Sequence, residues 1–202
     1  LIKNDELSAD KRREYLEIAR KHTKRLGELI GDLFELSKLD SASIHPTVEA
    51  FSLAELLHDI VHEYELDAQR RDVKLSIEAP NDAAIVYADI GLMQRVLENL
   101  IRNALKFTPP GGRIDIRLDK RPDAVLVAIE DTGCGIAEED LEHVFDRFYR
   151  AENATQSGSN NAGLGLAIVR KILDLHGSRI SVTSQVDRGT CFEFDLPTQA
   201  AA

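Results

Sequence analysis

The stretch "SGSNNAGLGLAIVRKIL" (157–173) places small polar residues directly before a helical pattern, with glycines at the joint. A loop that enters a helix needs only a capping residue, so Gly163 and Gly165 indicate that another group comes close to the backbone there. Helix N-termini favour anions, because their N–H groups are free and the helix dipole is positive at that end. We therefore expect an anion site at the start of helix 164–176, under a loop that closes as a lid. The sequence lacks G-x-x-x-x-G-K-[ST], so the site is not the usual P-loop.

A helix expected over residues 90–107 carries a polar stripe opposite its apolar face. Asparagine is a poor helix former, yet Asn99 and Asn103 both fall in the middle of this helix. An amide oxygen is a ligand for Mg²⁺, and Lys106, one turn on, is suited to phosphate. The alternative is an ordinary solvated face. The core side is expected to comprise Met93, Leu97, Leu100, Ile101 and Ala104.

The stretch "EDTGCGIAEED" (130–140) ends an apolar strand with Asp131 at its tip. A carboxylate there accepts a hydrogen bond from an exocyclic amine such as that of adenine, and the following glycines let a flat ring lie against the backbone. The alternative is a turn that caps the next helix.

The asparagine-bearing helix, the Asp-Gly turn and the glycine-rich loop follow one another in this order along the chain. In that order they resemble the motifs of the ATP-binding domain shared by sensor histidine kinases, gyrase, MutL and the heat-shock chaperone of ninety kilodaltons. Within that superfamily the resemblance is to histidine kinases, over residues 44–197. The segments similar to their N, G1, F and G2 boxes and to their closing hairpin are "NLIRNALKFTP" (99–109), "DTGCGI" (131–136), "FDRFYR" (145–150), "GLGLAI" (163–168) and "RGTCFEFDLP" (188–197).

The resemblance implies a role for each matching residue at the phosphate end of the nucleotide. Asn103 would bind the Mg²⁺ that bridges the ATP phosphates, with Asn99 nearby, and Lys106 would contact phosphate. Arg147 would point at phosphate as well. Gly163 and Gly165 would hinge the lid and approach the phosphates, and Leu164 between them is also expected to bind the nucleotide.

At the adenine end, the resemblance implies that Asp131 receives the amino group and that Phe107 lies against the ring. Phe145 and Phe148 would anchor the base of the lid. The residues implied to make room for the base, line its pocket or fix it are Gly133, Gly135, Ile136, Leu166 and Thr190.

One position separates the branches of the superfamily. The ATP-hydrolysing members carry Glu four residues before the Mg²⁺-binding Asn, as a general base for water. This chain has Asn99 there, and Glu98 is turned about 100° away around the helix. The resemblance thus implies phosphoryl transfer to a protein side chain, by positioning and charge neutralisation. The alternatives are a water-hydrolysing ATPase and a non-catalytic dimerising scaffold with a degenerate nucleotide site.

The phosphoryl acceptor is expected on a histidine upstream of this chain, for relay to the receiver domain of a response regulator. The family places this histidine in an H-[ED]-x-[RK]-x-P motif, which the 202 residues lack. His22 is followed by Thr23, Lys24 and Arg25, without an acid or a proline, and is interpreted as a residue of a helical seam.

The periodicity predicts a two-layer α/β sandwich, a mixed sheet covered on one face by helices and preceded by a long bundle helix. The resemblance implies that residues 1–42 are part of a dimerisation and phosphotransfer hairpin, namely its second helix, and that residues 43–202 are the ATP-binding domain. The helix 8–40 carries a heptad seam that predicts homodimerisation or aggregation. The seam comprises Tyr15, Ala19, His22, Leu26, Leu29, Leu33 and Leu36. The other helices are expected at 51–71, 90–107, 138–145 and 164–176, and the strands at 73–79, 84–88, 112–120, 124–131, 179–185 and 190–197.

Composition narrows the location and the partners. A net charge of −10 argues against nucleic acid as a partner. Cys134 and Cys191 lack metal-ligand spacing, so a zinc site is not expected. The cysteine usage and the absence of a signal peptide predict a cytoplasmic location. No apolar run reaches membrane-spanning length, so any membrane attachment is expected only through regions absent from this chain.

Overall fold

The computed structural model describes residues 8–41, 45–80, 84–151 and 163–199. Its main sheet has the strand order β2-β4-β5-β7-β6, in which β2 and β4 are parallel and all other neighbours antiparallel. The sheet is therefore mixed, as predicted. Its strands are β2 (Lys74–Glu78), β4 (Arg113–Lys120), β5 (Ala124–Asp131), β6 (Ile180–Gln185) and β7 (Gly189–Pro197).

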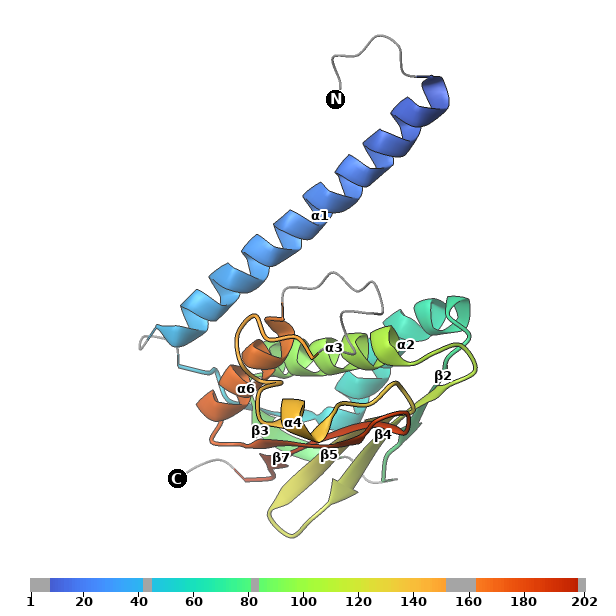
Figure 1. Ribbon diagram of the computed structural model, residues 1–202. Helices are drawn as coiled ribbons and strands as arrows, with labels where there is room; N and C mark the ends of the chain where they lie inside the picture. The colour runs from blue at the N-terminus through green and yellow to red at the C-terminus, as the bar shows by residue number, and fades with distance from the viewer. Residues whose placement is uncertain (1–7, 42–44, 81–83, 152–162, 200–202) are drawn as a thin grey trace.

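A layer of helices covers one face of this sheet (Figure 1). The strands bury alternate residues against it, as expected for a sheet with one covered face. The apolar face predicted for helix 90–107 is buried throughout, so the two-layer sandwich is confirmed. The covering helices are α2 (Leu53–Arg70), α3 (Ile90–Phe107) and α6 (Gly165–Leu175).

The helices begin where the sequence places capping residues. Ser52 accepts a hydrogen bond from the Glu55 N–H at the start of α2. Asp89 accepts one from the Leu92 N–H at the start of α3. Such caps satisfy N–H groups that have no partner within the helix.

Two local predictions were wrong. Residues Glu49–Ser52 form a strand, β1, which pairs antiparallel with β3 (Ile85–Ala88). The helix predicted at 138–145 is the short α4 (Glu138–Leu141), after which the chain continues in turns. The N–H groups of His143 and Asp146 bond to carbonyls three residues earlier, so a longer helix does not propagate.

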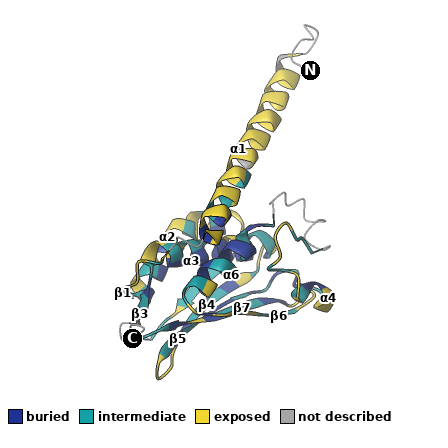
Figure 2. Cartoon of the chain, turned by 90° about the vertical axis from the view of Figure 1, so that its left-hand side faces the viewer, coloured by how far each residue is buried: buried dark blue, intermediate teal, exposed yellow. Residues whose placement is uncertain are grey.

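A long helix, α1 (Ala9–Asp40), extends beyond the sandwich (Figure 1). Ser8 caps it by accepting a hydrogen bond from the Lys11 N–H. Leu36 and Leu39 near its C-terminal end are buried, Leu29, Asp32 and Glu35 are partly buried, and most of its other described residues are exposed (Figure 2). Within the described residues, no helix is long and apolar enough to span a bilayer.

Candidate functional site

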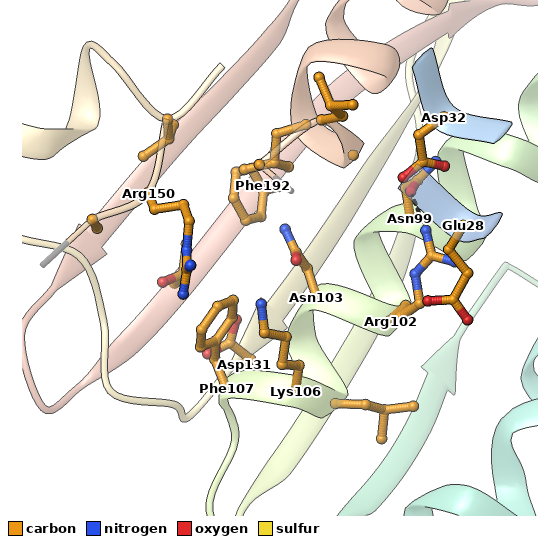
Figure 3. Close-up of a pocket in the computed structure, with 18 of the residues that line it drawn as sticks. Glu28, Asp32, Asn99, Arg102, Asn103, Lys106, Phe107, Asp131, Arg150 and Phe192 are labelled. Atoms are coloured by element: carbon orange, nitrogen blue, oxygen red, sulfur yellow. Dashed lines mark hydrogen bonds between the residues drawn. The ribbon is translucent and has the colours of Figure 1, made fainter. Parts of the chain in front are cut away.

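A cavity of about 940 Å³ lies where α3, the end of β5 and the start of α6 meet. Side chains from these separate segments surround it in Figure 3. The predicted site residues that line it are Asn99, Asn103, Lys106, Phe107, Asp131, Gly135, Ile136, Gly163, Leu164, Gly165, Leu166 and Thr190.

The C-terminal half of α3 supplies the polar side chains on one wall. Asn103 is half-buried and projects toward the cavity (Figure 3). Lys106 lies with its Nζ 4.3 Å from the centroid of the Phe107 ring, a cation–π contact. Burial, together with the positive charges of Arg150 and Arg102, lowers the pKa of Lys106 to about 8. An anion in the cavity would favour the charged amine.

Asp131 ends β5 and is 6% exposed. Its Oδ1 accepts a hydrogen bond from the Gly133 N–H at 2.8 Å. Burial raises the pKa of Asp131 to about 6, although the backbone N–H groups of Gly133 and Thr190 oppose the shift. Thr190 is the neighbour of Asp131 across the β5–β7 pairing, and its Oγ1 lies 2.9 Å from Ser184 Oγ. This wall thus combines a buried acceptor with hydroxyl groups.

The glycines before α6 permit close approach, as the sequence indicates. Gly163 has a φ of +73°, and a Cβ there would lie 2.4 Å from the carbonyl oxygen of Tyr149. A Cβ on Gly165 would lie 3.0 Å from Asn99 Oδ1. The groups that lie close to Gly163 and Gly165 in the structure therefore belong to this protein: the Tyr149 carbonyl and the Asn99 amide. Leu164 occupies the N-cap position of α6 and makes no side-chain capping bond within the described residues, so the first N–H groups of α6 are suited to a ligand or water.

Asn99 is buried, with 3% of its surface exposed, although other residues nearby on the cavity lining are more open. Its Nδ2 donates to the Arg95 carbonyl oxygen at 2.9 Å, and its Oδ1 accepts from Arg102 Nη2 at 2.5 Å. Both ends of the amide therefore have protein partners. We interpret Asn99 as a side chain held within α3 at the edge of the cavity, close to the start of α6.

Several predicted site residues lie outside the cavity lining. Arg147 was expected at phosphate; in the structure it is outside the cavity lining, and its Nη2 bonds to Asp40 Oδ2 at 2.6 Å. Phe148 is 62% exposed, and Gly133 lies behind Asp131 as its hydrogen-bond donor. Phe145 packs edge-on against Phe192, with centroids 6.2 Å apart. The predicted lid itself lies largely at 152–162, outside the described residues.

Other lining residues were not predicted. Arg150 faces the cavity opposite α3 (Figure 3), and its position as the last residue of the F-box-like segment was the available signal. Phe192 lines the cavity from β7 and could be found only from strand pairing. The acidic residues of α1 on the lining are Glu28, Asp32 and Glu35, which nothing in the local sequence marks as site residues.

Comparison with known proteins identifies the class. Residues 88–200 match the family described as "Histidine kinase-, DNA gyrase B-, and HSP90-like ATPase". The chain belongs to this family, and it is therefore an ATP-binding domain. Its relatives are sensor histidine kinases, so it is a catalytic domain of the histidine kinase type.

The relatives align with nearly the whole length of this chain. Drug sensory protein A of Synechocystis is 37% identical over 95% of this chain. A structure of full-length ShkA in complex with AMPPNP covers 98% of this chain and 41% of its own, with a TM-score of 0.81 and 26% identity. Histidine kinase ThkA in complex with response regulator TrrA covers 96% of this chain and 53% of its own, with a TM-score of 0.78 and 26% identity. The chain spans about a third of the curated relatives it matches, 30% in the case of drug sensory protein A.

Proposed function

We propose that this cavity holds ATP with its adenine at Asp131 and its triphosphate toward Asn103, Lys106 and the start of α6. The observation that carries the proposal is that these groups, distant in sequence, line one cavity. A buried carboxyl acceptor suits the adenine amino group, and a helix N-terminus beside a lysine suits phosphate. Phe107 offers a ring face to the base.

We further propose that Asn103 holds Mg²⁺ through its amide oxygen. Among the described residues, no group of three or more His, Cys, Asp and Glu side chains is placed to bind a metal. That fits Mg²⁺ bound by one protein oxygen, with phosphate and water as the other ligands. The chemistry that Mg²⁺ supplies when bound is neutralisation of phosphate charge.

The arrangement favours transfer to a protein side chain over hydrolysis. Asn99 stands where the ATP-hydrolysing members of the superfamily carry a glutamate base, and its amide is engaged by protein groups. Glu98 does not line the cavity, and its Oε1 accepts a hydrogen bond from Gln94 Nε2 at 2.8 Å. The proposed acceptor is a histidine upstream of residue 1, whose phosphoryl group passes to the receiver domain of a response regulator. The ThkA–TrrA complex supports that kind of partner.

We also propose that the protein is a homodimer through α1, acts in the cytoplasm, and meets a membrane only through regions outside this chain. The exposed apolar seam of α1 supports the dimer.

The test uses a chimera that joins a family hairpin helix bearing H-[ED]-x-[RK]-x-P before Leu1. With γ-labelled ATP and Mg²⁺, we expect label that is stable in base and lost in acid, as for phosphohistidine. Asn103→Ala in the chimera should abolish the label, and the 202-residue chain alone should acquire none. Gln94→Ala, an exposed position on the same helix, is the matched control. A chimera that binds ADP yet stays unlabelled would contradict the transfer.

A further inference from the structure

The acidic face of α1 forms part of the cavity wall. Glu28, Asp32 and Glu35 are spaced by four and three residues, so they share one face of the helix. All three line the cavity that Asn103 and Lys106 also line. Glu28 and Asp32 lie beside Arg102 in Figure 3. A polyanion in this cavity would therefore meet carboxylates from α1 as well as cations from α3.

Arg95 of α3 joins two of these carboxylates. Its Nε lies 3.0 and 2.9 Å from the Glu35 carboxylate oxygens, and its Nη2 lies 3.0 Å from Asp32 Oδ1. The three side chains are between 21% and 28% exposed, so water and salt screen them less than surface charges. Two carboxylates therefore share one guanidinium at the cavity wall, and the charge of Arg102 also acts on Asp32.

A second contact uses the last residue of α1. Asp40 bonds to Arg147 at 2.6 Å and lies 3.5 Å from Lys171 Nζ on α6. Of the cations paired with α1 carboxylates, Arg95 lines the cavity, whereas Arg147 and Lys171 lie outside its lining. The charge of Arg95 is correspondingly less available to a ligand.

We propose that Asp32 and Glu35 of α1 set the charge selectivity of the cavity, lowering its affinity for nucleoside triphosphate relative to uncharged nucleoside. The proposal rests on the nucleotide site proposed above. The physical cause is repulsion between the α1 carboxylates and the phosphate groups. In addition, the ion pairs with Asp32 and Glu35 make the charge of Arg95 less available to the phosphates. Neither effect changes the binding of the uncharged adenine and ribose. The loss of affinity therefore grows with the number of phosphates on the ligand.

The experiment compares Asp32→Asn/Glu35→Gln with the wild-type chain by calorimetry with adenosine, ADP and a non-hydrolysable ATP analogue. Each substitution preserves side-chain size and removes one charge. We expect about three- to tenfold tighter binding of the ATP analogue, a smaller gain for ADP and none for adenosine. The gain should shrink as salt is raised. The control Glu14→Gln/Glu17→Gln changes the net charge equally at exposed positions of α1 outside the cavity lining.

The outcomes separate this proposal from the nucleotide site itself. If the wild type binds the ATP analogue and the double variant binds it no more tightly, the α1 carboxylates do not set selectivity. An equal gain for all three ligands would also overturn the proposal, because it would indicate a change of cavity shape rather than of charge. If the wild type binds no nucleotide, the proposed function fails and this inference fails with it.

Discussion

Asp131 is a buried carboxyl group, and burial disfavours its charged form and raises its pKa to about 6. In the unfolded chain an aspartate ionises near pH 4, so the folded state carries the cost of the charged form at neutral pH. Because the pKa is higher in the folded state, ionisation of Asp131 lowers the free energy of unfolding. This loss is absent below the unfolded pKa and fully present above about pH 6. A residue that costs stability in this way is typical of a binding site.

Asp131→Asn should therefore stabilise the ligand-free protein at pH 7.5, by about 1 to 3 kcal/mol. The gain should vanish at about pH 3, below the unfolded pKa, where the carboxyl group is protonated in both states. Urea unfolding at the two pH values measures it, with Asp119→Asn, an exposed position, as the control. A gain that is equal at both pH values would show that burial of charge is not its cause.

At the residue scale, the sequence predicted groups whose role is set by a local motif. Asn103 and Asp131 lie in such motifs, and both line the cavity. Arg147 lies in one too, but its partner Asp40 is 107 positions earlier in the chain. The spacing of neighbouring residues carries no information about such a pair. The α1 carboxylates were missed for the same reason.

At the scale of elements, α1 leaves most of its predicted seam uncovered. Tyr15, Leu26 and Leu33 are 42%, 57% and 52% exposed, whereas Leu36 is buried. Exposed apolar side chains at heptad spacing are costly in water and are suited to another helix. This exposed seam is the surface that the proposed homodimer would use.

We expect the wild-type chain to associate as its concentration rises, measured by light scattering. Leu26→Glu/Leu33→Glu should shift it toward monomer by placing charge on the seam. Arg20→Glu changes the net charge by the same amount on another face of α1 and should leave association intact. A wild-type chain that stays monomeric at high concentration would rule out this use of the seam.

Helices and strands with clear periodicity were predicted well, and those without it were not. The core face of α3 follows from its apolar spacing, and all its predicted members are buried. β1 has four residues with an exposed or half-exposed pattern, so only its pairing with β3 defines it. α4 has acidic residues suited to a helix start, but the turns that follow it end the helix.

At the scale of the whole molecule, the sandwich brings the end of one central strand and two helix segments to a single cavity. The alternation of strands and helices predicted the layers. It did not predict that β5 would lie between β4 and β7, the pairing that sets Asp131 beside Thr190. It also did not predict that α1 would contribute a wall.

Calorimetric titration with ADP and Mg²⁺ tests the shared nucleotide site most directly. Asn103→Ala and Asp131→Ala should each weaken binding by about 10- to 100-fold, the cost of losing a hydrogen bond to a charged or buried partner. Gln94→Ala should bind like the wild type. If both cavity variants bound ADP as tightly as the wild type, the nucleotide would not lie between Asn103 and Asp131.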